Sequence, residues 1–254
     1  MKQEIAERQL EKIEMLGAGI HNVTMQEAMG AIERFIDEGG MHQVITLNAE
    51  ILYQAQTNER LLSVINHVDL VTPDGSGIVW GARTLGTPLK ERVSGIDLLW
   101  EICRRSPEKG WRIYLLGAAP GIPEKAEKNL EAKYPGISIV GVRNGYFDIN
   151  DKAQVEEILA EVAASGADVL FVAMGAPRQE YFIREHREAL GTKVAIGVGG
   201  SFDVVAGEVK RAPVFMQRMG IEWLWRLLSQ PSRWRRMLNL PRFVFLVKRV
   251  KKTK

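Results

Sequence analysis

Polar residues stand where several predicted strands end, and their side chains are the first candidates for chemistry. Asp74, for example, follows a short apolar run within Pro73-Asp74-Gly75-Ser76-Gly77. The full set at strand ends is Thr46, Asn48, Asp74, Ser76, Tyr146, Gln179 and Asp203. Ligands of open parallel sheets bind outside the carboxyl ends of the strands. Carboxylates, amides and hydroxyls that meet at this edge could therefore bind or activate a substrate.

Each of these residues also has a purely structural interpretation. Thr46 and Asn48 could cap a helix that begins near Glu50. Asp74 in Pro-Asp-Gly is an ordinary turn residue, and Asp203 could be a helix cap. Their convergence on one edge of the sheet is what favours a functional role.

Several other chemistries lack their motifs. The sequence has no His-Glu-x-x-His, paired-cysteine, Gly-x-Ser-x-Gly or Walker motif. The histidines are scattered and are better interpreted as surface or hydrogen-bonded residues: His21, His42, His67 and His186. No Asp-x-Asp is present to hold a metal against a nucleotide-sugar diphosphate. We therefore expect no metal and no cofactor, with arginines and the backbone amides of the segment 117–121 taking the charge of a diphosphate.

The elements that must position these residues alternate between strands and helices. The predicted strands are Gln43–Leu47, Asp69–Thr72, Trp111–Leu116, Ile137–Val142, Asp168–Ala173 and Val194–Val198. Helices are predicted from a capping box at Thr24 to Ile36, from Pro123 to near Tyr134, from Asp151 to Ala164 and from Pro177 to Leu190. Apolar runs closed by glycine are typical of parallel strands buried on both faces. The pattern predicts an α/β fold: an open, mostly parallel, Rossmann-like sheet with helices on both faces.

The C-terminal residues differ in charge and composition. Ten basic and no acidic residues lie between Arg226 and Lys254, so the total charge of +3 leaves −7 for residues 1–225. Aromatic and aliphatic residues are interspersed, and helices are predicted over Val214–Leu228, Ser232–Leu240 and Phe243–Val250, with Pro241 separating the last two. We therefore divide the chain into a catalytic domain (1–213) and a helical appendage (214–254) that binds an anionic membrane surface.

The remaining composition favours the cytoplasm. The N-terminus is densely charged and lacks an apolar signal region, no stretch is apolar enough to span a bilayer, and the single cysteine, Cys103, sits in a predicted buried helix. Together with the basic C-terminal residues, this predicts a cytoplasmic protein held peripherally at the inner face of the cell membrane. The sequence leaves the oligomeric state, including a homo-oligomer, open.

Seven motifs occur in the order found in the WecG/TagA/CpsF glycosyltransferases (glycosyltransferase family 26), and the resemblance is closest to the TagA branch. The motifs are Thr46-Leu47-Asn48-Ala49-Glu50, Pro73-Asp74-Gly75-Ser76-Gly77, Glu91-Arg92-Val93-Ser94-Gly95, Leu116-Gly117-Ala118, Gly145-Tyr146-Phe147, Gly175-Ala176-Pro177-Arg178-Gln179-Glu180 and Gly199-Gly200-Ser201-Phe202-Asp203. The resemblance spans Leu16 to Phe243. It implies inverting transfer of N-acetylmannosamine from UDP-N-acetylmannosamine to undecaprenyl-diphosphate-linked N-acetylglucosamine, in wall teichoic acid synthesis. Other branches use other UDP sugars.

The resemblance also implies residue roles. Asp74 matches the family's proposed catalytic base, and Thr46, Arg92 and Gln179 match pocket residues beside the donor sugar and diphosphate. The substrate-binding set that it implies is Asn48, Ser76, Gly117, Ala118, Tyr146 (stacked on uracil), Asp203 (at the nucleoside), Arg226, Arg233 and Arg236. The last three match basic residues of a C-terminal appendage that completes the active site. Leu47, where relatives often carry proline, is the one local departure.

Two other classes of function remain open at this stage. Asp74-Gly75-Ser76-Gly77-Ile78-Val79-Trp80-Gly81 approximates a dinucleotide fingerprint with its third glycine one residue late, which weakly favours a nicotinamide-dependent oxidoreductase. Thermal stabilisation by UDP or by NAD would separate the two enzymes. The basic C-terminal residues could instead bind nucleic acid. The acidic remainder would repel a phosphate backbone, so we expect no nucleic-acid partner.

Overall fold

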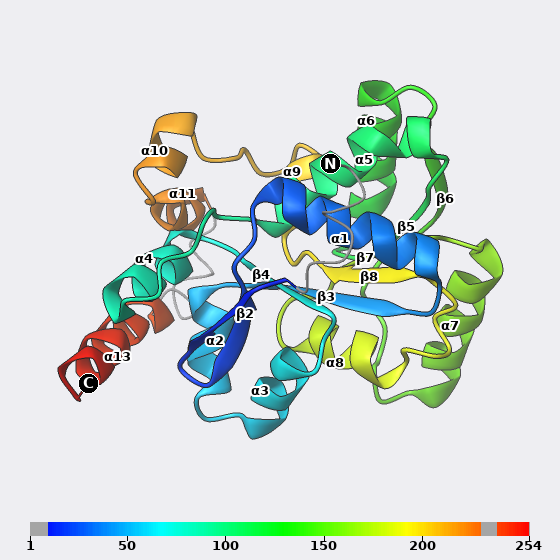
Figure 1. The fold of residues 1–254 in the computed structure, drawn as a ribbon. Helices are drawn as coiled ribbons and strands as arrows, with labels where there is room; N and C mark the ends of the chain where they lie inside the picture. The colour runs from blue at the N-terminus through cyan, green and yellow to red at the C-terminus, as the bar shows by residue number, and fades with distance from the viewer. Residues whose placement is uncertain (1–9, 230–237, 254) are drawn as a thin grey trace, which may run out of the picture.

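A six-stranded parallel sheet forms the centre of the protein, whose computed structural model describes residues 10–229 and 238–253 (Figure 1). The strand order is β4-β3-β8-β7-β5-β6. The strands are β3 (His42–Leu47), β4 (Leu70–Pro73), β5 (Arg112–Gly117), β6 (Ser138–Arg143), β7 (Val169–Ala173) and β8 (Val194–Gly197). All six predicted strands are confirmed, and with them the open Rossmann-like α/β fold.

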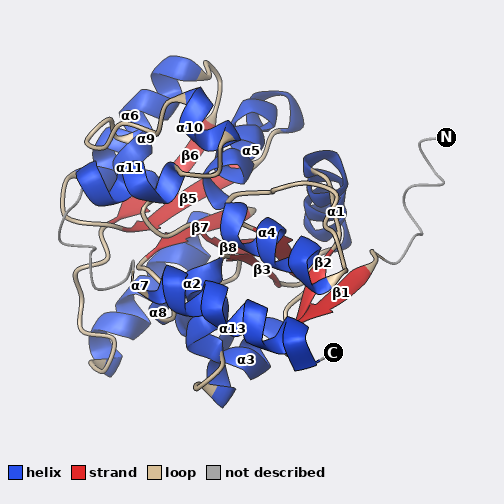
Figure 2. Cartoon of the chain, turned by 90° about the vertical axis from the view of Figure 1, so that its left-hand side faces the viewer, coloured by secondary structure: helices blue, strands red, loops and turns tan. Residues whose placement is uncertain are grey.

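Helices cover both faces of this sheet (Figure 2). One face packs against α1 (Met25–Glu38), α5 (Gly95–Lys109), α6 (Ile122–Lys133) and α9 (Ser201–Val205). The other face packs against α2 (Ala49–Ala55), α3 (Glu59–Asn66), α4 (Ser76–Leu85), α7 (Lys152–Ser165) and α8 (Arg178–Glu185). Alternate residues of a strand serve opposite faces, as Val44 and Ile45 of β3 do.

Local sequence signals explain most helix boundaries. Thr24 forms the predicted capping box with Glu27 at the start of α1. Asp151 caps α7, while α8 ends at Glu185, earlier than the Leu190 predicted from the sequence. Cys103 lies fully buried on α5, in the helix expected for it.

A small antiparallel hairpin was not predicted. It consists of β1 (Lys12–Met15) and β2 (Ala18–His21). Its turn places Leu16 at φ 53° and Gly17 at φ 79°. A leucine in the left-handed region is uncommon. The turn therefore lacks the asparagine–glycine pair by which a two-residue hairpin is recognised in sequence. The hairpin contacts α3 and β4 and extends the core on that side.

The C-terminal residues form α10 (Val214–Arg218), α11 (Glu222–Ser229) and α13 (Asn239–Thr253). The single helix predicted over 214–228 is interrupted at Gly220, which has φ 73°. The prediction that Pro241 separates two helices is wrong, because proline lies in the first turn of α13, where its missing N–H costs nothing. The predicted segment Ser232–Leu240 falls largely outside the described residues.

Helix α13 packs against α2 and α4 rather than standing apart (Figure 1). Phe243 and Val247 are buried in the same hydrophobic cluster as strand residues of β3 and β4. The division of the chain at residue 213 stays a prediction, but part of the C-terminal segment contributes directly to the core. None of the described helices is long and apolar enough to cross a membrane.

Candidate active site

The order of the strands brings the predicted residues to one edge of the sheet. Asp74 directly follows β4, and its backbone N–H donates to the carbonyl of Leu47 at the end of β3, at 2.8 Å. The N–H of Val93 donates to the carbonyl of Pro73 at 2.9 Å. Asp74 therefore lies between the end of β3 and the loop that carries Arg92.

Two residues near Asp74, one on β3 and one directly after it, have structural tasks. Thr46 is buried, and its hydroxyl donates to the carbonyl of Gly197 on β8 at 2.9 Å. The backbone of α5 lies close above it, because a Cβ placed on Gly95 would be only 3.0 Å from the Thr46 hydroxyl oxygen. Asn48 caps α2 by accepting a hydrogen bond from the N–H of Ile51, which confirms the structural interpretation for this residue.

Gln179 joins the loops that follow β7 and β8. Its side-chain Oε1 accepts from the N–H of Gly175 at 3.0 Å and from the N–H of Gly199 at 3.1 Å. Its Nε2 donates to the carboxylate of Glu180 at 2.8 Å, and both side chains are buried. Gln179 thus shapes the rim of the site through two glycine loops.

The loops after β5 and β6 are held close together by backbone contacts. Gly117 has φ 125°, and a Cβ there would lie 2.6 Å from the backbone of Ala173, so only glycine fits. The N–H of Ala118, at φ 61°, donates to the carbonyl of Ala173, and its carbonyl accepts from the N–H of Gly145. The Ala118 amide is therefore committed to the fold. Tyr146, the next residue, is 75% exposed and presents its ring to solvent.

Asp203 lies on α9, on the opposite side of the sheet from α8. It is the third residue of that helix rather than its cap, so the capping interpretation is wrong. Its backbone carbonyl accepts from the N–H groups of Glu208 and Val209.

Arg178 connects the loop that carries Tyr146 to α8. Its guanidinium donates to the backbone carbonyl of Phe147 at 2.8 Å and lies over the Phe147 ring.

A cluster of paired charges surrounds Arg92 at this edge. Its Nη1 donates to Glu222 on α11 at 2.8 Å, and its Nη2 lies 3.6 Å from Asp97 on α5. Arg211 pairs with both oxygens of Asp97, at 2.6 and 2.9 Å, and its Nε lies 3.9 Å from Glu222. Of these four residues, only Arg92 belongs to a motif that predicts a site residue from sequence.

The protonation of the cluster follows from its geometry. Burial alone would raise the pKa of Asp97, but hydrogen bonds from Arg211 and Ser94 and the charges of both arginines lower it below the ordinary value. Burial alone would lower the pKa of Arg211, but its bonds to Asp97 and the charges of Asp97, Glu222 and Asp74 raise it. Asp74 is thus near enough to Arg211 to interact with its charge.

The whole chain can be compared with known proteins. Residues 13–254 match the model of the glycosyl transferase WecG/TagA/CpsF family. The chain belongs to this family. The glycosyltransferase is 38% identical to a protein of Bacillus spizizenii, in an alignment that covers 84% of this chain and 81% of the relative. It is 32% identical to a protein of Staphylococcus aureus strain MRSA252, in an alignment that covers 95% of this chain and 94% of the relative. Both relatives are named N-acetylglucosaminyldiphosphoundecaprenol N-acetyl-beta-D-mannosaminyltransferase.

In this glycosyltransferase, the C-terminal segment reaches the edge of the site. The hydroxyl of Ser76 donates to the carbonyl of Gly220 at 2.7 Å, which brings the turn between α10 and α11 against the start of α4. Arg226 lies within α11, whereas Arg233 and Arg236 lie outside the described residues. The substrate-binding role of these three arginines stays a prediction.

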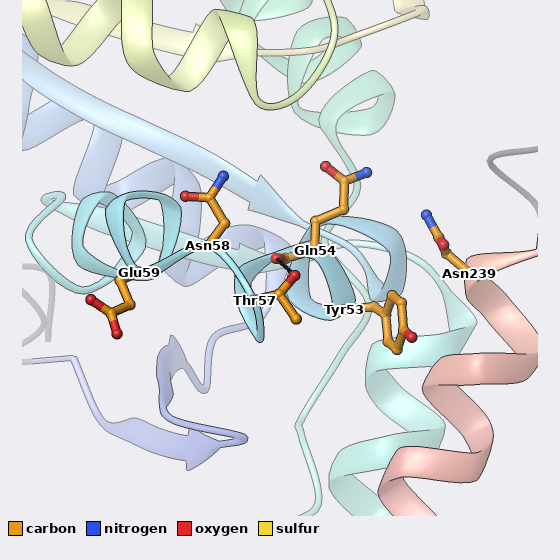
Figure 3. Close-up of a pocket in the computed structure, with 6 residues that line it drawn as sticks. All are labelled: Tyr53, Gln54, Thr57, Asn58, Glu59 and Asn239. Carbon is orange, nitrogen blue, oxygen red and sulfur yellow. Dashed lines mark hydrogen bonds between the residues drawn. The ribbon is translucent and has the colours of Figure 1, made fainter.

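Two hollows lie elsewhere on the glycosyltransferase, along α2 and α13. The larger, of about 750 Å³, is lined by Tyr53, Gln54, Thr57, Asn58, Glu59 and Asn239 (Figure 3). The smaller, of about 410 Å³, is formed by Tyr53 and residues of α13. Neither is lined by a strand-end residue. The strand ends remain the candidate active site, because the paired charges, the glycine loops and the family motifs coincide there.

No group of three histidine, cysteine or acidic side chains in residues 10–229 and 238–253 is arranged to hold a metal ion. The metal-independence of the reaction stays a prediction.

Proposed function

We propose that this chain transfers N-acetylmannosamine from UDP-N-acetylmannosamine to N-acetylglucosamine on undecaprenyl diphosphate, with inversion, in the synthesis of the wall teichoic acid linkage unit. The names of relatives that align over most of the chain support the sugar and the acceptor. The observation that carries the chemistry is the position of Asp74, a carboxylate at a strand end beside the cluster of Arg92 and Arg211.

The residues of this edge suit an inverting displacement. As the acceptor hydroxyl oxygen bonds to the anomeric carbon, Asp74 takes the hydroxyl proton and the bond to the UDP oxygen breaks. The departing diphosphate keeps that electron pair, and Arg92 would stabilise its charge. Tyr146 offers an exposed ring on which uracil can stack.

The alternative is a UDP donor with another sugar, such as N-acetylmannosaminuronic acid or glucose. Epimers and close analogues differ by single chemical groups, and no motif in the sequence distinguishes them.

The acceptor would place the enzyme at the inner face of the membrane, with the basic C-terminal helix against anionic lipid. The outward face of α13 carries Phe245, 69% exposed, among basic residues.

The test is mass spectrometry of the product formed from the lipid-linked acceptor and a panel of UDP sugars. The wild-type protein is expected to add N-acetylhexosamine from UDP-N-acetylmannosamine. Asp74→Asn is expected to lower turnover about a hundredfold or more with UDP affinity retained. Asp37→Asn, an exposed change on α1, is the matched control. Near-normal turnover of Asp74→Asn would remove Asp74 from the role of base.

A further inference from the structure

Two arginines and two acids form a charge cluster at the edge of the site, with the charge of Asp74 acting on it from outside. Arg92 contacts Glu222 at 2.8 Å and Asp97 at 3.6 Å, while Arg211 contacts Asp97 at 2.6 Å and Glu222 at 3.9 Å. Each arginine thus faces both acids, and the four formal charges cancel. Arg92, the guanidinium proposed above to stabilise the departing diphosphate, is thus already paired with a carboxylate of the protein.

The four contacts are unequal. Glu222 uses Oε2 for the short bond to Arg92, and its Oε1 only approaches the Nε of Arg211. This Nε is buried and makes no hydrogen bond within the part of the chain that the structure describes. A buried donor without a partner is costly. Arg211 therefore offers Glu222 a second place to bind, close to the first.

The helix that carries Glu222 is fixed at this edge by contacts outside the cluster. The carbonyl of Gly220 accepts from Ser76, and the indole N–H of Trp225 donates to the carbonyl of Lys210 at 2.8 Å. The backbones are close, since a Cβ on Gly220 would lie 2.9 Å from that of Ser76. Glu222 can thus change partner by turning its side chain while α11 stays in place.

We propose that Glu222 sets the affinity of the enzyme for its donor: it competes with the diphosphate for Arg92 and moves to Arg211 when the donor binds. This inference rests on the proposed function. The exchange leaves Arg92, Arg211 and Glu222 each with a partner in both states, because the diphosphate takes Arg92 as Glu222 takes the Nε of Arg211. A carboxylate on the diphosphate site also keeps Arg92 from binding other anions in the empty enzyme.

The proposal predicts which part of the donor is affected. Removing the carboxylate frees Arg92, so ligands with a diphosphate gain affinity and ligands without one do not. Titration calorimetry with UDP and with uridine separates the two. In Glu222→Gln, which keeps the size of the side chain, we expect UDP to bind roughly three- to tenfold more tightly and uridine to bind as in the wild type. Glu222→Asp, whose shorter side chain weakens the bond to Arg92, is expected to bind UDP with an affinity between those of the wild type and Glu222→Gln.

A charge-matched control and a coupling measurement complete the test. Glu208→Gln removes an acid that pairs with Lys125 on the surface, and it is expected to leave UDP affinity unchanged. Arg211→Lys keeps a cation for Asp97 but removes the Nε to which Glu222 would move. Made in the wild-type protein, this substitution is expected to lower the affinity for UDP. Made in Glu222→Gln, it is expected to change the affinity for UDP little. Additive effects of the two substitutions would mean that Glu222 acts only through long-range charge, and would overturn the exchange.

Two results overturn the inference directly: unchanged or weaker UDP binding by a Glu222→Gln protein with a wild-type melting curve, or an equal gain for uridine and UDP. If the wild-type protein binds neither UDP nor UDP-N-acetylmannosamine, the donor assignment itself is wrong. That result is distinct from the other two, because it appears without any substitution.

Discussion

Gln179 connects two loops of the site, and its replacement by methionine should destabilise the whole protein. Methionine fills similar space but cannot accept hydrogen bonds from the N–H groups of Gly175 and Gly199, or donate to the carboxylate of Glu180. Each buried group left without a partner costs about 1–3 kcal/mol. Since the two amides are only partly buried, we expect a total loss of roughly 3–5 kcal/mol.

For a chain of this length, a loss of that size lowers the Tm by roughly 5–15 °C. Thermal unfolding followed by circular dichroism measures it, with urea unfolding as a second measure of the free energy. Gln54→Met is the matched control, because the Gln54 side chain donates to Glu50 within one helix at 3.3 Å and joins no loops. If Gln179→Met melts within about 2 °C of that control, the hydrogen bonds of Gln179 do not hold the two loops, and this account of the site rim is wrong.

Three further results are expected. Transfer activity should survive EDTA, and a loss that magnesium or manganese restores would show that a metal is needed. Burial lowers the pKa of His21 to about 4, so between pH 6.5 and 4 the unfolded chain binds a proton that the native state does not. As the pH is lowered through this range, the free energy of unfolding should decrease by up to about 1.4 kcal/mol per pH unit. The decrease should be less steep in His21→Gln. Phe243→Ala, at a fully buried position of α13, should cost about 3–5 kcal/mol of unfolding free energy, whereas Phe245→Ala should leave stability within about 0.5 kcal/mol and weaken binding to anionic vesicles.

The strands were predictable because burial on both faces forces nearly continuous apolar runs. Residues 169–173 and 194–197 are buried throughout, and a short apolar run closed by glycine is typical of a strand in that position. The helix starts were predictable for a local reason as well: Thr24 and Asp151 satisfy backbone N–H groups within three residues of themselves. Both signals lie within a few residues of the element that they define.

The charge cluster could not be predicted in this way. Arg92 and Glu222 are 130 residues apart, and neither stands in a pattern that reports the other. Asp97 appears in sequence as an ordinary residue of a helix first turn, which conceals its contact with Arg211. The hairpin was missed because a leucine occupies the left-handed position of its turn, where sequence rules expect glycine or asparagine.

Two tasks are predicted for the C-terminal residues: binding to the membrane and completion of the active site. A truncation before Ile221 would remove both at once. That truncation would also remove Phe243 and Val247 from the core, and would expose the surfaces of α2 and α4 that α13 covers. Loss of activity in the truncated protein could then follow from unfolding alone. Single substitutions can test the tasks of the segment one at a time. Phe243 is buried in the core, Phe245 is exposed, and Glu222 pairs with Arg92. Distinct effects of these three changes, on stability, vesicle binding and UDP affinity respectively, would establish that one segment serves the core, the membrane and the site by different side chains.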